Sequence, residues 1–355
     1  MSSLGFGELL KGECQCGGDM AVTGKEIPDE VKEILDIVCR HFQVFDFKGT
    51  EREAEAEVES QEPKRAFLLL SDELEKKGYI AALKKKGGGM RLLLLKFPPP
   101  RREGIWLSIL LLMSTAITTL WAGMRLFGDL MNAFVLSSSL LAILGAHEAG
   151  HKLAAKKNGI EISNPYFIPA PPLLGTFGSV IMVKKPIRTK EAMMQMGFLG
   201  PLLGFILALL CMLLGLLQPA KGISLPMLPA LFLLITRNPS AQLNPLLFSG
   251  CVMMMITAMN LLPAGQLDGG HIFRGLTTAA KHYKLTRTLG FVLLFTGFIF
   301  PAYPLWIWGL LILLFFGQPH PGALDDFTEV SKDYRLITAA SIVILLLCMP
   351  IPTKL

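Results

Sequence analysis

Hydrophobic and polar residues change their pattern once along this chain of 355 residues. Up to Pro98 the apolar positions recur at short spacings and Lys and Glu are frequent, whereas after Glu103 long uncharged runs dominate. A domain boundary is therefore predicted at 98–102. Before it, the composition predicts a disordered tail over 1–25 and a small α+β domain over 26–98.

The pattern within 26–98 predicts two helices and a sheet. Apolar residues at Val31, Ile34, Leu35 and Val38 have helical spacing. Helices are expected over 27–40 and 63–77, and strands over 43–48, 54–60, 79–84 and 90–97. The last two strands form a hairpin around three consecutive glycines, which supply the left-handed backbone of a tight turn. No catalytic cluster is found in this segment, so a docking or regulatory module is expected.

From Gly104 onwards the apolar runs are long enough to cross a bilayer, which takes roughly 20 residues. Spans are predicted over 104–126, 130–155, 192–217, 246–262, 285–300, 305–317 and 336–350. The fifth and sixth are short and joined by Pro301-Ala302-Tyr303-Pro304, so they are two spans or one tight hairpin. The fold class predicted is a polytopic α-helical membrane protein with about six to seven transmembrane helices over 104–355. The segment 1–25 lacks an apolar signal core, so the first span is expected to direct insertion.

Composition and charge support this interpretation and orient it. Hydrophobic residues make up 52% of the chain and charged residues 17%, below the roughly 25% of soluble domains. The side of the membrane that carries Arg101 and Lys156 collects 13 Lys and Arg residues of the predicted loops, and the other side collects four. The first side, with the α+β domain, is therefore predicted to be cytoplasmic. The net charge of +6 comes without a basic cluster interleaved with aromatics, so no nucleic-acid partner is expected.

Residues 147–151 read His-Glu-Ala-Gly-His inside the second apolar run. Two histidines four residues apart lie on one helix face, so His147 and His151 can bind one zinc ion. Glu148 lies beside them, where a carboxylate can act as general base towards a zinc-activated water. Ionisable residues at membrane depth are costly and usually mark function. The alternative is a helix end whose charged residues merely reach water.

A catalytic zinc site needs a third protein ligand and one open position. Asp268 is the best candidate, because the apolar run before it is broken by Pro263 and Gly265. Broken backbone at membrane depth is tolerated where protein or a water-filled cavity surrounds it. Gly269 and Gly270 are expected to let the chain turn sharply near the metal. The alternative makes Asp268 a simple helix cap.

Together, His147-Glu148-Ala149-Gly150-His151 and the later Asn260-Leu261-Leu262-Pro263 and Leu267-Asp268-Gly269-Gly270 resemble the site-2 protease family of intramembrane zinc metalloproteases, peptidase family M50. The resemblance covers a core of about 130–275. It implies that His147, His151 and Asp268 bind one Zn2+ per chain, that Glu148 is the general base, and that a single-span substrate, usually cut once already, is hydrolysed within the bilayer. Asn260 matches the family's asparagine, with substrate or oxyanion contact or a helix–helix hydrogen bond as its role.

The segment 165–186 resembles the re-entrant β-hairpin that this family places beside its active site. Gly175, Thr176, Phe177 and Gly178 are then expected to pair with an unwound substrate by strand addition; an ordinary cytoplasmic loop is the alternative. The segment 218–245 is too short for an inserted PDZ domain. The chain therefore looks closest to the PDZ-less branch found in archaea, cyanobacteria and plastids.

Other chemistry-bearing residues have less specific interpretations. Cys14 and Cys16 supply too few ligands for a structural zinc site. His271 could orient a ligand, whereas His282 and His320 are expected to be solvated in loops. Two other functions compete with the protease: a membrane metal transporter, which would need ligands across the bilayer, and a catalytically silent scaffold, which would not need Glu148. The oligomeric state is not predicted.

Overall fold

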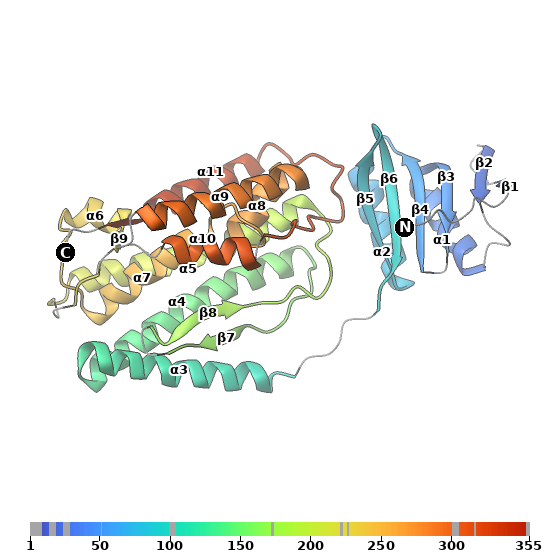
Figure 1. Ribbon diagram of the computed structural model, residues 1–355. Coiled ribbons are helices and arrows are strands. Elements are labelled where there is room, and N and C mark those ends of the chain that lie inside the picture. Colours follow the sequence, from blue (N-terminus) through green and yellow to red (C-terminus); the bar gives the residue numbers. More distant parts are fainter. Residues whose placement is uncertain are drawn as a thin grey trace. The chain divides into compact units, whose positions relative to one another are not determined.

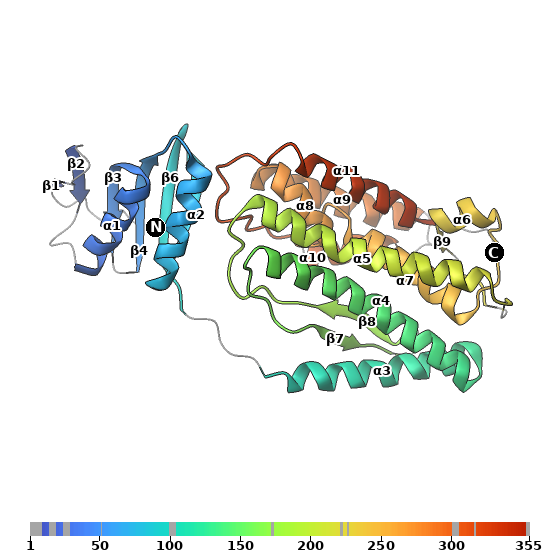
Figure 2. The same ribbon diagram turned by 180° about the vertical axis from the view of Figure 1, so that it is seen from behind.

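The computed structural model describes residues 9–13, 19–23, 29–50, 52–98, 104–171, 174–220, 223–225, 227–299, 305–315 and 317–352. The chain divides into two compact units. Unit 1 comprises residues 1–101 together with 188–190 and 323–329, and unit 2 comprises 102–187, 191–322 and 330–355. Both are drawn in Figures 1 and 2.

Unit 1 is a six-stranded sheet with two helices (Figure 1). Its elements are β1 (Leu9–Glu13), β2 (Asp19–Thr23), α1 (Asp29–His41), β3 (Gln43–Gly49), β4 (Glu53–Glu59), α2 (Pro63–Lys76), β5 (Tyr79–Lys86) and β6 (Gly89–Lys96). The sheet order is β1-β2-β3-β4-β6-β5, with β2 and β3 parallel and the other neighbours antiparallel. The bounds of its helices α1 and α2 and of its strands β3 to β6 lie within a few residues of the ranges expected over 26–98.

Strand β4 shows why the sheet has one covered face. Ala54, Ala56 and Val58 are buried in a core with α1 and α2, whereas the intervening glutamates point to the other face. There Arg91 of β6 forms ion pairs with Glu55 and Glu57. The period-2 alternation of a half-buried strand is thus real, although alanine makes it a weak hydrophobic signal.

The segment 1–25, predicted to be disordered, contains two described strands. β1 pairs with β2, and β2 continues the sheet at the edge of β3 through Ala21 and Val22. Backbone pairing at a sheet edge requires extended chain rather than a strong apolar pattern. The sequence composition therefore could not reveal it. The rest of that segment, including Cys14 and Cys16, lies outside the described residues.

Two short segments from later in the sequence also belong to unit 1. The amide of Leu83 donates to the Leu324 carbonyl at 2.9 Å, and the amide of Asp326 donates to the Leu83 carbonyl at 2.9 Å. Leu324 and Phe327 pack against the core of the unit. Arg188 forms ion pairs with two acidic residues of α2, Asp72 and Glu75. The segments that precede α5 and α11 are thus part of the α+β unit.

Unit 2 is mostly helical and encloses the main hydrophobic core (Figure 2). Its elements are α3 (Trp106–Phe127), α4 (Leu130–Lys157), β7 (Tyr166–Pro169), β8 (Thr176–Val180), α5 (Lys190–Leu216), β9 (Met227–Pro229), α6 (Ala230–Thr236), α7 (Pro245–Asn260), α8 (Asp268–Leu276), α9 (Ala279–Ile299), α10 (Leu305–Phe315), α11 (Tyr334–Cys348) and β10 (Pro350–Pro352). In the described residues, α3, α4 and α5 are long and apolar enough to cross a membrane. Helices lie where the apolar runs predicted them, and α6, α8 and the β9–β10 pair lie outside the predicted spans.

Small and hydroxyl-bearing residues hold α3 and α4 together. A Cβ on Gly123 would lie 2.6 Å from the Cα of Ala133, so the two backbones approach closely there. The hydroxyls of Thr119 and Ser137 are hydrogen-bonded at 2.6 Å across the same interface. Between apolar helices such close packing and interhelical hydrogen bonds replace the hydrophobic driving force that water provides.

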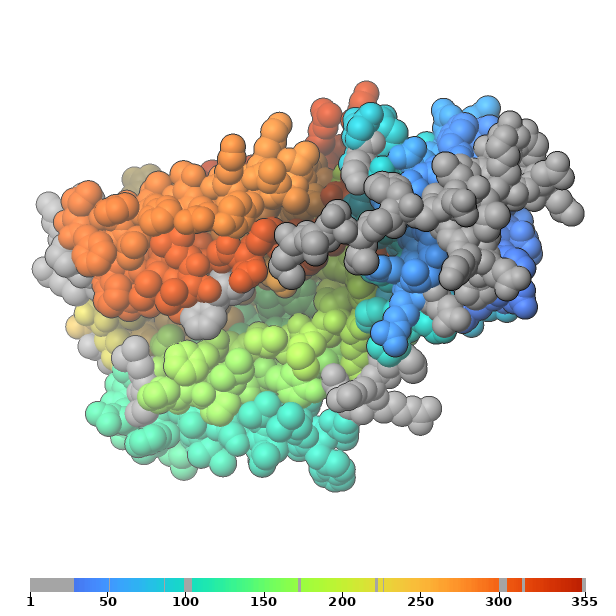
Figure 3. All heavy atoms as spheres, turned by 45° about the vertical axis from the view of Figure 1, so that its right-hand side comes forward, coloured from blue at the N-terminus to red at the C-terminus, as the bar shows by residue number. Residues whose placement is uncertain are grey.

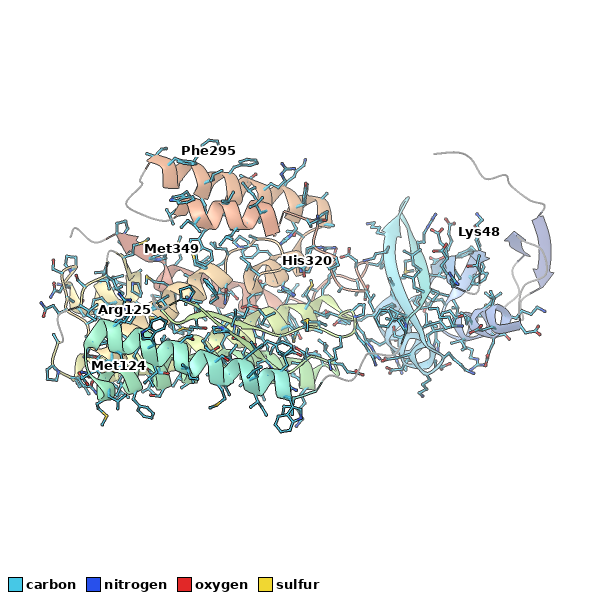
Figure 4. All side chains as sticks on the ribbon, turned by 60° about the horizontal axis from the view of Figure 1, so that its bottom comes forward. Lys48, Met124, Arg125, Phe295, His320 and Met349 are labelled. Atoms are coloured by element: carbon cyan, nitrogen blue, oxygen red, sulfur yellow. The ribbon has the colours of Figure 1, made fainter. Side chains whose placement is uncertain are left out.

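The β7–β8 hairpin lies beside α3 and α4 (Figures 1 and 2). On the face shown in Figure 3, its lime-green surface lies between the teal surface of α3 and the deeper orange surface of α10. Figure 4 shows Phe295 on the outer side of α9, where its side chain is exposed. Exposed apolar side chains of this kind are abundant on unit 2, as expected for a surface in contact with lipid.

Candidate metal centre

Helix α4 places three functional side chains on one of its buried faces. His147 and Glu148 are 7% and 5% exposed, and the ring of His151 lies one turn further along. The start of the helix is capped by Asp129, whose carboxylate accepts a hydrogen bond from the amide of Asn132 at 2.9 Å. The helix therefore begins well before the motif, and both histidines lie in regular helical backbone.

Asp268 meets both histidines from another part of the chain. Helix α7 ends at Asn260, the backbone bends, and α8 begins at Asp268. Its Oδ2 lies 3.3 Å from the Nε2 of His147, and its Oδ1 lies 3.5 Å from the Nε2 of His151. The two Nε2 atoms are 3.0 Å apart. One ligand atom from each of these three residues thus lies within 4.8 Å of the others.

The surroundings orient these atoms as ligands. The Nδ1 of His151 lies 2.9 Å from the Met196 carbonyl, which can only accept a hydrogen bond. Nδ1 therefore carries the proton, and the lone pair of Nε2 is directed at the centre. Asp268 occupies the first turn of α8, where the helix dipole favours a negative charge. Asp268 is not a simple helix cap, because Leu267 occupies the N-cap position of α8 and the Asp268 carboxylate faces the histidines.

Three glycines of α5 make room for this cluster. A Cβ on Gly200 would lie 2.3 Å from the Nε2 of His151, and one on Gly204 would lie 3.2 Å from the Nδ1 of His147. A Cβ on Gly197 would lie 2.3 Å from the Asp268 carbonyl oxygen. These three glycines were not among the site residues predicted from the sequence, although small residues at helical spacing in an apolar helix are a recognised packing signal.

Gly269 and Gly270 are needed for a reason other than the one predicted. Both belong to α8 and neither has a positive φ, so the sharp turn is not made there. Gly265 has the left-handed backbone, with φ of 49°. A Cβ on Gly269 would lie 2.0 Å from the Leu261 carbonyl oxygen, and one on Gly270 would lie 2.3 Å from that of Gly265. The paired glycines thus let α8 pack directly on the preceding bend.

A cavity of about 270 Å³ opens onto the cluster. Its lining includes Glu148, Asn260 at the end of α7, Gln266 from the bend, and Ser179 and Ile181 from the hairpin region. Among the described residues, the buried Oε2 of Glu148 has no hydrogen-bond partner, and Asn260 contributes to the cavity wall. The cavity therefore holds polar groups that are available to a bound molecule.

The predicted hairpin residues lie at the start of strand β8. Gly175 precedes the strand with φ of 80°, and Thr176, Phe177 and Gly178 are its first three residues. Phe177 is 74% exposed. Further along this strand, the Ser179 hydroxyl donates a hydrogen bond to Glu148 beside the cluster. Ser179 was not predicted as a site residue, because a single serine in a predicted hairpin carries no spacing signal.

Two of the remaining histidines are not placed as expected. His282 and His320, predicted to be solvated, are 1% and 4% exposed. The ring of His320 packs edge-to-face on His271 and on His282, with centroids 4.8 Å and 5.5 Å apart. The chain before α11 thus brings His320 against His271 and His282, and such a long-range contact cannot be seen in local composition. His271 lines the cavity and its Nδ1 lies 3.0 Å from the Leu267 carbonyl, next to Asp268.

This arrangement fits a zinc ion. Two imidazole nitrogens and one carboxylate oxygen converge, which is the donor set of many catalytic zinc sites. The neighbouring glutamate does not contribute to that group of atoms, and it faces the same cavity. A three-ligand centre with a nearby base suits the activation of water for hydrolysis.

Comparison with known proteins supports the same assignment. Residues 135–302 match the model of peptidase family M50. The chain is 30% identical over 232 residues to the probable chloroplastic zinc metalloprotease EGY2 of Oryza sativa subsp. indica, covering 59% of this chain and 41% of that protein. It is 30% identical over 241 residues to the probable chloroplastic zinc metalloprotease EGY1 of Arabidopsis thaliana, covering 62% and 43%.

An archaeal relative is more distant. Zinc metalloprotease MJ0392 of Methanocaldococcus jannaschii is 25% identical over 207 residues, covering 57% of this chain and 53% of that protein. The chain thus spans about two fifths to one half of the length of these relatives. No solved structure matches it. The match to the family model and the metal-binding geometry agree with the motif resemblance to peptidase family M50.

Proposed function

We propose that this protein is an intramembrane zinc metalloprotease of the site-2 type that hydrolyses peptide bonds within or near transmembrane segments. The observation that carries the proposal is the meeting of His147, His151 and Asp268 in a buried cluster beside Glu148 and a cavity. The apolar surface of unit 2 supports a bilayer location for that cluster. The names of the relatives agree with both zinc and proteolysis.

In the proposed mechanism His147, His151 and Asp268 hold one zinc ion per chain. When bound, zinc supplies a Lewis acid that brings the pKa of water near 7. Glu148 accepts the proton of the attacking water at its unpartnered Oε2 and transfers it to the leaving amine. Asn260, on the cavity wall, donates its amide hydrogens to the substrate carbonyl oxygen as negative charge develops there.

The β7–β8 hairpin is proposed to align the substrate. It is a two-stranded sheet, so a further strand can add to an edge among the described residues. Gly175, Thr176, Phe177 and Gly178 lead along β8 towards Ser179 at the cavity. A helical substrate hides its carbonyls in backbone hydrogen bonds. Strand addition would expose them to attack, which is why we assign this segment to substrate pairing and propose that it is re-entrant.

The proposed substrate is a single-span membrane protein, already shortened by an earlier cut, that enters from the surrounding bilayer. Six to seven spans with a cytoplasmic α+β domain remain the proposed topology. The excess of Lys and Arg on one side supports it. The side proposed to face away from the cytoplasm carries few basic residues, one of which is Arg125. In Figure 4, Arg125 lies at the same end of unit 2 as Met349, and His320 lies nearer the other end.

Two other functions are less well supported. A metal transporter needs ligands along a path across the bilayer. In the described residues, the only group of three suitable side chains is the one at His147, His151 and Asp268. A silent scaffold has no use for a buried carboxylate with an unpartnered oxygen beside that group.

The test is cleavage of fluorescently labelled single-span peptides by full-length protein in detergent. Glu148→Gln keeps the size of the side chain and removes the base, so a loss of about 10²–10⁴-fold in kcat is expected. Zinc content should stay at about one per chain in both proteins. The control is Glu329→Gln, which changes an exposed carboxylate and should leave kcat unchanged. Equal cleavage by wild type and Glu148→Gln would rule out the mechanism.

A further inference from the structure

Glu148 is held through one of its two carboxylate oxygens. The Ser179 hydroxyl donates a hydrogen bond of 2.5 Å to Oε1, whereas Oε2 is buried and has no partner in the described part of the chain. Ser179 comes from β8 and Glu148 from α4, so this bond joins the hairpin to the motif helix. The two oxygens of the carboxylate are therefore not equivalent in this protein.

The position of Ser179 is set by contacts elsewhere in the hairpin. Thr118 of α3 donates its hydroxyl to the Gly175 carbonyl at 2.6 Å. Gly175 lies so close to α3 that a Cβ on it would be 2.5 Å from the Cα of Thr119. These contacts fasten the beginning of β8 to α3. The position of Ser179 beside Glu148 therefore depends on contacts of β8 with α3 that do not involve the Ser179 hydroxyl.

The strand is also stiffened internally. The Thr176 hydroxyl accepts a hydrogen bond from the amide of Gly178 at 2.9 Å and lies 3.1 Å from the Ile168 carbonyl of β7. Ser179 itself pairs with Phe167 in the hairpin register. Removing the Ser179 hydroxyl would leave all of these contacts in place. A role in holding Glu148 can thus be separated from a role in holding the hairpin.

From this geometry we propose that Ser179 is a positioning residue, which fixes the Glu148 carboxylate through Oε1 and leaves Oε2 directed to the attacking water. The inference rests on the proposed proteolytic function and links the substrate-pairing strand to the general base. The strand assigned to substrate pairing also orients the base. A glutamate side chain has three rotatable bonds, and a charge-assisted hydrogen bond is strong enough to select one arrangement. Substrate alignment and base alignment would then depend on the same strand.

The test compares full-length wild type, Ser179→Ala and Ser179→Thr with the labelled single-span peptides. Ser179→Ala should lower kcat about 10-fold, the equivalent of about 1.4 kcal/mol, with KM within about twofold. Ser179→Thr restores a hydroxyl on a residue suited to strands and should recover most of kcat. Ser138→Ala is the matched control, because the exposed Ser138 hydroxyl bonds only carbonyls of its own helix.

A measurement without turnover distinguishes positioning from structure. Hydrogen–deuterium exchange over residues 176–183 should be the same in wild type and Ser179→Ala, because the anchoring contacts do not use this hydroxyl. Zinc content should also be unchanged. Faster exchange in this segment would show that Ser179 holds the hairpin, and would overturn the proposed role.

The possible failures can be told apart. If wild type cleaves, Glu148→Gln does not, and Ser179→Ala matches wild type, only the role of Ser179 is wrong. A rise in KM at unchanged kcat would likewise overturn it, since that result belongs to substrate pairing alone. If zinc-loaded wild type shows no cleavage above Glu148→Gln, the proposed function fails, and the assignment of Ser179 fails with it.

Discussion

The ring of His151 occupies the space next to Gly200 that a larger residue would need. A Cβ on Gly200 would lie 2.3 Å from Nε2 and 2.5 Å from Cε1 of His151. Helix α5 therefore passes the metal cluster with only its backbone facing the ring. The same helix supplies the Met196 carbonyl that fixes the histidine tautomer. Close approach of α5 thus sets both the position and the tautomer of the His151 ring.

The first prediction concerns this approach. Gly200→Ala should lower zinc affinity about 10–100-fold, because the added methyl group must displace the His151 ring or the helix. The measurement is zinc retention during titration with a competing chelator. Gly145→Ala on α4 is the control, since a Cβ there meets no atom within 4 Å. Equal zinc affinity in the two variants would contradict the close packing described above.

The second prediction tests Asp268 as a ligand. Asp268→Asn keeps the shape of the side chain and removes the charge that faces two imidazoles, so the purified variant should lose most of its zinc. Metal content per chain is measured by atomic absorption. Asp36→Asn makes the same change at an exposed position of α1 and should keep the wild-type content. A full complement of zinc in Asp268→Asn would remove this carboxylate from the site.

The third prediction concerns the segment 323–329 within unit 1. Asp325 is 2% exposed, and its Oδ1 accepts hydrogen bonds from the amides of Phe327 at 3.1 Å and Thr328 at 2.9 Å. Asp325→Ala leaves two amides without this acceptor and should destabilise the segment by about 1–3 kcal/mol. The Leu83 and Asp326 amides form the hydrogen bonds that join β5 to this segment, so their hydrogen–deuterium exchange should become faster.

Asp36→Ala serves as the control for this third prediction, because Asp36 is exposed on α1 and lies away from the segment. If Asp325→Ala and Asp36→Ala show the same exchange at Leu83 and Asp326, the loop is held by its apolar residues alone. Leu324 and Phe327 would then account for its place in the core of unit 1.

Local patterns of the sequence were enough for most elements and for naming the residues of the candidate metal centre. Helical spacing predicted α1, and long apolar runs predicted the places of α3, α4 and α5, because each depends on residues close together in the chain. The placement of His147 and His151 on one face follows from the regular turn of a helix in the same way. The sequence also identified Asp268 as a candidate, through the break in its apolar run.

Only the tertiary structure decided how distant segments meet. It brought Asp268 to the two histidines, put Gly200 against His151 and joined Ser179 to Glu148. It also buried His282 and His320, which local composition had suggested were solvated. Such contacts depend on which helix faces pack and how closely their backbones approach. That is a property of many segments together, and no single spacing along the chain encodes it.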